Sequence, residues 1–304
     1  MAINNQLKPE ISVIIPTCNR PDLLPRAIKS VLNQTFQDFE IIVVDDGDKI
    51  SAEKAMAQFN DGRLKYIKHE KRQGGGAARN TGLRNSQGEY IAFLDDDDEY
   101  LPSKLKRLYG IMKEYETEAD FVFCTVTNYY EKDNKVVTTK IDELGAFNYF
   151  NMLLAHQIRI LTPATLIKKS ALMDIGGFDE NLPSNQEWDL MIRLSKKSKG
   201  YGINTSLVKV YIPTDGHINA DFGRRIKGRE MIINKHFADL KERPEVLANH
   251  YFWLGLFCRD NKQFKEARDY FKKAWQEKFK FLFFAHYLSM VFSGAVYKII
   301  YKGI

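Results

Sequence analysis

The sequence predicts an α/β fold in which helices cover both faces of a mostly parallel sheet, followed by an all-helical C-terminal region. Two observations support this prediction. In about the first 100 residues, short continuous apolar runs alternate with amphipathic stretches of helical period, as in parallel sheets buried on both faces. From residue 245 onward, the strand pattern gives way to a helical one.

Four apolar runs are predicted strands, and polar residues follow three of them. The runs span 11–15, 40–44, 64–67 and 90–94, and helices are predicted over 22–33 and 76–85. Pro16 closes the first run. Ligands of open α/β sheets bind beyond the carboxyl ends of the strands, so three strand ends are expected to converge on one crevice. The polar residues at these ends are Thr17, Asn19 and Arg20, then Asp45 and Asp46, then residues 95–98.

Later elements are less regular. Strands are predicted over 121–128, 135–140 and 163–168, a tight turn over 176–180 and a helix over 186–197. Between about 215 and 245, glycine, aspartate and basic residues replace the strand pattern. We therefore expect two domains, 1–225 and 226–304.

Four consecutive aspartates, 95–98, follow the last of the four strands. Crowding four like charges costs free energy, which a bound hard cation would offset, so the run predicts a metal and diphosphate site. The alternative is an acidic first turn of the next helix, because acidic residues suit helix N-termini and Pro102 marks a plausible helix start. Asp98 and Glu99 are predicted to begin that helix.

Charge is distributed unevenly along the chain. The net charge is +6, but residues 191–304 hold 22 Lys and Arg against 10 Asp and Glu. This basic part attracts phosphates, whether of nucleic acid, anionic lipid or a diphosphate-linked substrate, although no groove-reading or base-stacking motif supports nucleic acid. Three isolated cysteines and an N-terminus without an apolar signal region indicate a cytoplasmic protein with reduced thiols.

The helical tail contains one unit that matches a tetratricopeptide repeat. The matching positions are Tyr251, Gly255, Ala267, Phe271 and Ala274. An apolar segment, 279–297, follows it. Three roles are open for this segment: lying on an anionic membrane surface, packing onto the repeat or a second subunit as in a homo-oligomer, and spanning a membrane, for which it is short and polar.

Six segments, in order and spacing, resemble inverting family 2 glycosyltransferases, which have the GT-A fold of nucleotide-diphospho-sugar transferases. The resemblance covers residues from about 9 to about 225. The segments are IIPTCNR (14–20), VVDDG (43–47), ARNTG (78–82), FLDDDD (93–98), GGFDE (176–180) and QEWDL (186–190).

The resemblance implies roles for the strand-end residues. The donor nucleotide, most commonly a UDP-sugar, would contact Pro16, Thr17, Asn19, Asp46, Arg79, Asn80, Asp95 and Asp96. Asp97 would hold Mn²⁺ or Mg²⁺ as the second acid of a DxD signature, and His217 is a further candidate for the metal or diphosphate. Arg224 and Arg225 are candidates for clamping a diphosphate of donor or acceptor; a solvated basic face is the equal alternative.

Glu187 stands at the position of the family's catalytic carboxylate, with Asp189 as the second choice. Inverting transfer needs one base to take the proton of the acceptor hydroxyl. The expected function is transfer of a sugar to a surface glycan, with a lipid-linked acceptor and a peripheral place at the inner membrane face suggested by the basic, apolar tail. The alternative is a non-catalytic nucleotide-sugar-binding scaffold that binds a partner through its tail.

Overall fold

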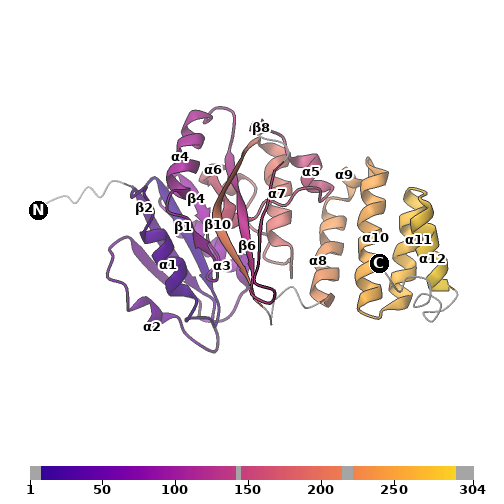
Figure 1. Ribbon diagram of the computed structural model, residues 1–304, viewed down its shortest axis with the longest axis horizontal. Coiled ribbons are helices and arrows are strands. Elements are labelled where there is room, and N and C mark those ends of the chain that lie inside the picture. Colours follow the sequence, from indigo (N-terminus) through magenta and orange to yellow (C-terminus); the bar gives the residue numbers. More distant parts are fainter. Residues whose placement is uncertain (1–7, 142–144, 214–221, 292–304) are drawn as a thin grey trace, which may run out of the picture. The chain divides into compact units, whose positions relative to one another are not determined.

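The computed structural model describes residues 8–141, 145–213 and 222–291 (Figure 1). The chain divides into two compact units. The first comprises Met1–Leu153, Ile158–Asn181 and Gln186–Gly216, and the second comprises Leu154–Gln157, Leu182–Asn185 and His217–Ile304. Two short segments from the middle of the chain therefore belong with the C-terminal helices, an interleaving that a single boundary in the sequence does not express.

The described residues of the first unit form one ten-stranded sheet. Its strands are β1 (Ile11–Thr17), β2 (Phe39–Asp45), β3 (Leu64–Lys68), β4 (Tyr90–Phe93), β5 (Glu99–Tyr100), β6 (Phe121–Tyr130), β7 (Lys135–Thr138), β8 (Gly145–Phe147), β9 (Thr165–Lys168) and β10 (Gly200–Ile212). Its helices are α1 (Leu24–Leu32), α2 (Glu53–Met56), α3 (Gly75–Asn85), α4 (Lys104–Glu114), α5 (Phe150–Leu154), α6 (Lys169–Asp174) and α7 (Gln186–Lys197), with a 3-10 turn at Thr162–Ala164.

The strand order is β3-β2-β1-β4-β9-β6-β10-β5, with β7 beside β6 and β8 beside β10. Strands β1, β2, β3 and β4 pair in parallel, and β6 pairs in parallel with β10. Strand β9 runs antiparallel to both β4 and β6 and joins the two parallel parts. The carboxyl ends of β1, β2 and β4 therefore lie at one edge, as the sequence predicts.

Helices cover both faces of this sheet. Successive residues of a strand point to opposite sides, so one strand contacts helices on both faces. Val13 and Ile15 of β1 belong to a buried cluster with Ala27 and Ile28 of α1, and α4 contributes to the same cluster. Ile14, between them, packs against Gly82 of α3 on the other face. The predicted fold class is confirmed.

Two predicted boundaries differ in the structure. β1 continues through Pro16 to Thr17, since Pro16 still aligns with Val44 of β2 where the pairing with β4 has ended at Ile14. Asp98 and Glu99 do not begin a helix: Glu99 lies in β5, and α4 begins only at Lys104. The prediction of an acidic first helical turn is wrong because the chain first pairs β5 with β10.

The longest strand, β10, escaped sequence analysis. It runs for 13 residues, most of its side chains are only partly buried, and its register shifts between Ile203 and Val208. Such a strand shows neither the continuous apolar run of a buried strand nor a clean alternation, so its pattern is weak.

The second unit is helical. Its helices are α8 (Phe222–Lys235), α9 (Phe237–Lys241), α10 (Pro244–Asp260), α11 (Phe264–Glu277) and α12 (Phe281–Val291). Ala267, Phe271 and Ala274 of α11 are fully buried, and Gly255 of α10 lies against the ring of Phe271. A tetratricopeptide repeat remains a prediction for this helix pair. None of the helices that the structure describes has both the length and the apolar content to cross a bilayer.

Candidate active site

Two of the three predicted strand ends are joined directly. Thr17 ends β1 and donates a hydrogen bond from Oγ1 to Asp96 Oδ2 at 2.7 Å, beyond the end of β4. Thr17 aligns with Asp45 at the end of β2. The parallel register thus gathers these polar groups at one edge, where donor-binding residues are expected.

Asp46, expected to contact the nucleotide base, is buried and holds the loop that leads into α3. Its carboxylate accepts hydrogen bonds from the backbone N–H groups of Gln73 and Gly74, both at 2.7 Å, and lies 2.8 Å from Nδ1 of His69. The other ring nitrogen of His69 lies 3.0 Å from Thr81 Oγ1. Sequence analysis missed His69, which no motif singles out. Each carboxylate oxygen of Asp46 has two lone pairs. Its Oδ2 accepts from the N–H of Gly74, which leaves room for one more donor.

Asn19 holds the adjoining loop in place. Its backbone has a φ of 57°, which asparagine tolerates better than most residues. Its side chain accepts hydrogen bonds from the N–H groups of Lys49 and Ile50 and donates one to Asp48, all at 2.9 Å. These contacts fix the loop after β2 beside the end of β1.

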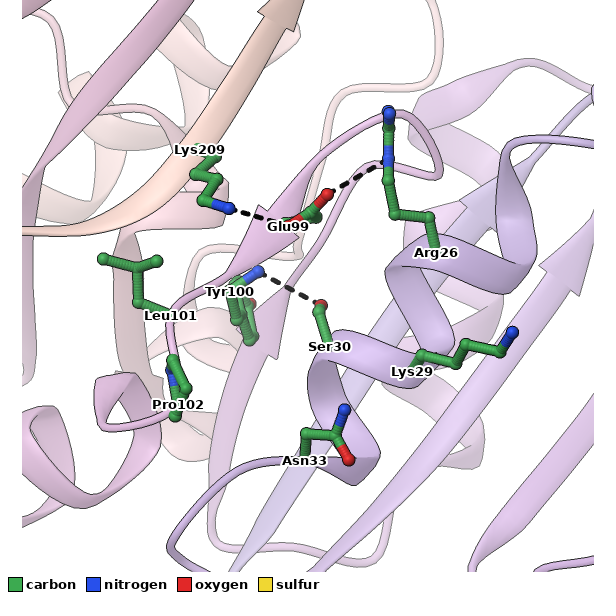
Figure 2. A pocket seen from close by; sticks show the side chains of 9 residues that line it. All are labelled: Arg26, Lys29, Ser30, Asn33, Glu99, Tyr100, Leu101, Pro102 and Lys209. Carbon is green, nitrogen blue, oxygen red and sulfur yellow. Dashed lines mark hydrogen bonds and ion pairs between the residues drawn. The ribbon is translucent and has the colours of Figure 1, made fainter.

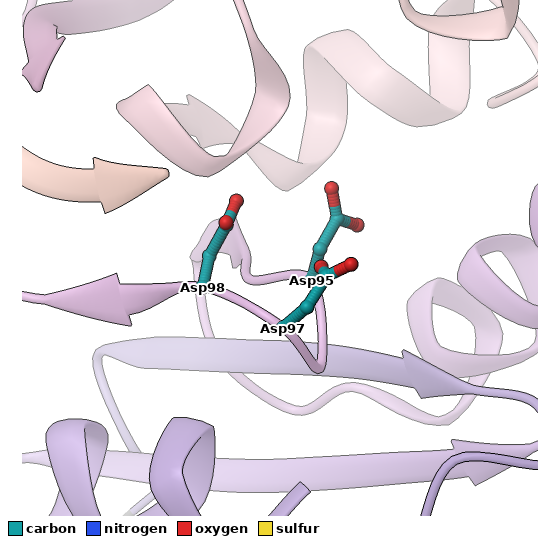
Figure 3. Close-up of side chains that lie close together, drawn as sticks. All are labelled: Asp95, Asp97 and Asp98. Carbon is teal, nitrogen blue, oxygen red and sulfur yellow. The ribbon is translucent and has the colours of Figure 1, made fainter. Parts of the chain in front are cut away.

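The acidic loop after β4 brings three carboxylates together (Figure 3). Oxygen atoms of Asp95, Asp97 and Asp98 all lie within 4.8 Å of one another. Three carboxylate oxygens form a donor set suited to Mg²⁺ or Mn²⁺. Asp98, predicted to begin the next helix, belongs to this cluster instead, and it also accepts a hydrogen bond from the N–H of Tyr211 at 3.1 Å.

Two arginines bind the same loop. Arg20 forms ion pairs with Asp96 and with Asp97, the second at 2.7 Å. Arg79 forms an ion pair with Asp95. Arg20 was noted only as a polar residue at a strand end, and its 76-residue separation from Asp96 gives no sequence signal.

Burial and crowding raise the pKa values of two loop carboxyls, those of Asp96 and Asp98. Burial raises the pKa of Asp96 to about 7, although Arg20 and Thr17 favour its charged form. Burial, reinforced by the charges of Asp95 and Asp97, raises the pKa of Asp98 to about 9. The loop carries four carboxyls against two arginines, so it has an excess of acidic groups and fits a divalent cation.

Glu187 in the first turn of α7 faces the acidic loop. Thr162 Oγ1 donates a hydrogen bond to Glu187 Oε1. Burial and then repulsion from Asp95 raise the pKa of Glu187, whereas the positive charge of Arg79 lowers it. A carboxylate in this setting is a stronger base than an exposed one. Thr162 is a site residue that sequence analysis missed.

Two predicted site residues brace the site from outside. Asp189 is buried and pairs with Arg193 at 2.8 Å, and Arg193 in turn donates to the carbonyl of Gly177. Asn80 accepts a hydrogen bond from the N–H of Phe178 and donates one to its carbonyl, at 2.8 and 2.9 Å. Both therefore secure the glycine turn at 176–177.

The remaining candidates belong to the second unit. His217 lies outside the described residues. Arg224 donates to the carbonyl of Pro183 at 2.9 Å, and the guanidinium of Arg225 lies 4.7 Å from the ring centre of Phe257.

A pocket of about 460 Å³ adjoins the acidic loop (Figure 2). Its lining is basic, but two of the basic side chains form ion pairs with Glu99. Lys209 lies 3.2 Å and Arg26 3.6 Å from the carboxylate of Glu99. Arg26 also donates to the carbonyl of Asp97 and stacks on Tyr211, 4.0 Å from the ring centre. This network supports the acidic loop from α1 and β10.

Comparison with known proteins finds a matching family model and several relatives. Residues 12–176 match the model of the family described as "Glycosyl transferase family 2". An uncharacterized glycosyltransferase of Methanocaldococcus jannaschii is 31% identical over 265 residues, which cover 82% of this chain and 86% of the relative. An uncharacterized glycosyltransferase of Rickettsia conorii is 37% identical over 207 residues, 67% of this chain. The chain spans about a third of that relative's length (33%) and 64% of that of a second, from Rickettsia typhi.

A shorter match carries a more specific name. A protein of Campylobacter jejuni named GalNAc(5)-diNAcBac-PP-undecaprenol beta-1,3-glucosyltransferase is 45% identical over 103 residues, 33% of each chain. Among solved structures, TarS 1–349 of S. aureus in complex with UDP superimposes with a TM-score of 0.65 at 17% identity, covering 93% of this chain and 90% of that one. This likeness shows the fold.

Proposed function

The chain belongs to glycosyl transferase family 2, and we propose that it transfers a sugar from a nucleoside-diphosphate donor to a hydroxyl, with inversion at the sugar carbon. One observation carries the proposal: Glu187 from α7 stands at the acidic loop after β4, where Asp95 and Arg79 both act on its carboxyl. A base and a cation-binding cluster thus share one site.

Glu187 is the proposed general base. It takes the proton of the acceptor hydroxyl as the oxygen attacks the anomeric carbon, and the bond from that carbon to the donor diphosphate breaks on the opposite face. Thr162 holds one carboxylate oxygen through its hydroxyl. The other oxygen is thereby oriented for proton transfer.

Asp95, Asp97 and Asp98 would hold the divalent cation. A bound Mn²⁺ or Mg²⁺ supplies offsetting charge for the departing diphosphate. Arg20 and Arg79 already contact the loop carboxylates, so they are available to bind phosphate oxygens when a cation takes over those carboxylates.

UDP is the proposed nucleotide and a glycan hydroxyl on a lipid diphosphate the proposed acceptor. TarS, which shares the fold, has been crystallised with UDP and with UDP-GlcNAc. The Campylobacter jejuni relative is named for an undecaprenol-linked glycan. We propose further that the protein works at an anionic membrane surface, because α12 begins with the exposed side chains of Phe281 and Leu282 beside basic residues.

The test is turnover of UDP-sugars in the presence of Mn²⁺ or Mg²⁺ by purified wild-type protein and two variants. Glu187→Gln should lower kcat by about 10²- to 10⁴-fold because it cannot accept the proton. Asp97→Asn should lower turnover by about 10²-fold or more because it weakens charge stabilisation of the leaving group. A melting-temperature screen with UDP, GDP and dTDP identifies the nucleotide through ligand-linked stabilisation.

Asp174→Asn is the matched control. Asp174 is exposed and pairs with Lys197 at 2.6 Å, so its loss should leave turnover unchanged. Undiminished rates in both site variants would exclude the assigned roles. Firm UDP binding by a wild-type protein that transfers to no acceptor would support a non-catalytic nucleotide-sugar-binding scaffold instead.

A further inference from the structure

Lys104 is a fully buried lysine that the proposed mechanism does not use. It is the first residue of α4, and its side chain has no exposed surface. Its ammonium lies 3.8 Å from the ring centre of Tyr100 and donates a hydrogen bond to the carbonyl of Thr165 at 3.0 Å. In the described part of the chain no carboxylate pairs with it.

This placement costs stability in two ways. Burial disfavours the ammonium and lowers the pKa of Lys104 to about 7. A cation at the start of a helix also meets the positive end of the helix dipole. An apolar side chain of similar volume would serve packing at least as well, because buried charges are weak contributors to stability. The residue therefore calls for an explanation beyond packing.

The contacts of Lys104 lead to the proposed base. Thr165, whose carbonyl Lys104 binds, donates from Oγ1 to the carbonyl of Thr162 at 2.8 Å. Thr162 in turn donates to Glu187. Three successive hydrogen bonds thus join the lysine to the carboxylate through the 3-10 turn that begins at Thr162.

The other contact of Lys104 leads to the acidic loop. The hydroxyl of Tyr100 donates to the carbonyl of Phe93, the last residue of β4 before that loop. The lysine therefore lies between the segment that orients Glu187 and the segment that precedes the three clustered aspartates.

We propose that Lys104 is a positioning residue, which sets the Thr162 turn against the acidic loop so that Glu187 keeps the orientation needed for proton transfer. The inference rests on the proposed function of Glu187 as the base. Lys104 touches neither donor nor acceptor in this scheme, so it acts on the rate of transfer and not on donor binding.

The test is a double-mutant cycle. Lys104→Met preserves volume but removes the donor and the charge, and Thr162→Val removes the hydroxyl that binds Glu187. Each should lower kcat by about 10-fold and leave the donor KM within about twofold, as expected when only transition-state geometry is lost. The double variant should lose no more than Thr162→Val alone, because the lysine acts through Thr162. Lys104→Gln, which retains a donor, should recover part of kcat.

Amide hydrogen exchange over residues 161–168 gives a readout independent of activity. Exchange there should rise in Lys104→Met and change less in Lys104→Gln, with or without a known substrate. Unchanged exchange, additive losses of kcat in the cycle, or a rise of KM in step with the fall of kcat would each overturn the positioning role. Absence of transfer by the wild-type protein would overturn the proposed function instead, and exchange would still decide the role of the lysine.

Discussion

At the scale of single residues, the site combines clustered carboxylates with arginines and hydroxyl groups that contact them. Five carboxylates, from residues 95–98 and 187, are offset by Arg20 and Arg79 and by hydroxyl donors. Burial, reinforced by the charges of neighbouring aspartates, raises the pKa values of Asp96 and Asp98. A site of this kind sacrifices stability for a function that needs concentrated negative charge.

Lys104 gives a pH test of stability at this scale. Burial lowers its pKa to about 7 from 10.5, so between these values the unfolded chain binds a proton that the folded protein lacks. Raising the pH through this window should therefore stabilise the wild type, by about 1.4 kcal/mol for each pH unit crossed. The measurement is urea denaturation of the wild type and Lys104→Met from pH 6.5 to about 9.5.

The difference in unfolding free energy between these two proteins should move in favour of the wild type as the pH rises. Lys29→Met is the control, since Lys29 is exposed on α1 and the same difference should stay flat. A flat difference for Lys104→Met would contradict the lowered pKa of the buried lysine.

At the scale of elements, the site depends on how closely α3 lies on the sheet. Gly82 of α3 has no side chain and rests directly on Ile14 of β1; a Cβ there would overlap with the Ile14 side chain. The same helix carries Arg79, which binds Asp95, and Asn80, which holds the Phe178 backbone. Displacing α3 would therefore disturb two contacts of the site at once.

Gly82→Ala should destabilise the protein by about 1–3 kcal/mol, because the added methyl overpacks the interface between helix and sheet. Gly110→Ala is the matched control. Gly110 also lies inside a helix, α4, but a Cβ there meets nothing within 4 Å. This second change should stabilise by about 0.5–1 kcal/mol through helix propensity. Equal effects of the two substitutions on the melting temperature would count against the close approach.

At the scale of the whole molecule, acidic and basic residues are concentrated in different parts of the chain. The proposed catalytic groups all lie in the first unit, whereas residues 191–304 carry 22 basic against 10 acidic residues. The second unit exposes Phe279 and Phe281, at 65% and 78% of their surface. Aromatic residues beside lysines are typical of surfaces that meet anionic bilayers.

The replacement of Phe279 and Phe281 together by serine should lower cosedimentation with anionic vesicles by about 10-fold, since it removes the apolar part of the contact. Binding of the wild type should also weaken as salt rises from about 0.1 to about 1 M, because salt screens the lysines. Val136→Ser, at an exposed site of β7 in the first unit, is the control and should bind as the wild type does. Equal binding to neutral and anionic vesicles would argue against the electrostatic contribution.

The sequence by itself determined the strands that carry the site and the loop that ends β4. Continuous apolar runs over β1, β2 and β4 are local signals of burial on both faces, and motif spacing was enough to indicate the family. The sequence did not predict the conformation of Asp98 or the course of β10. The first depends on a strand pairing with residues about 110 positions away, and the second has a half-buried, irregular pattern.

Only the tertiary structure decided which groups orient and neutralise the acidic residues. Arg20 meets Asp96 across 76 residues, and Thr162 meets Glu187 across 25. Nothing local distinguishes this arginine or this threonine from others in the chain. The contact of Arg20 arises because the strand order places β1 beside β4, and that order is fixed by packing of the whole sheet.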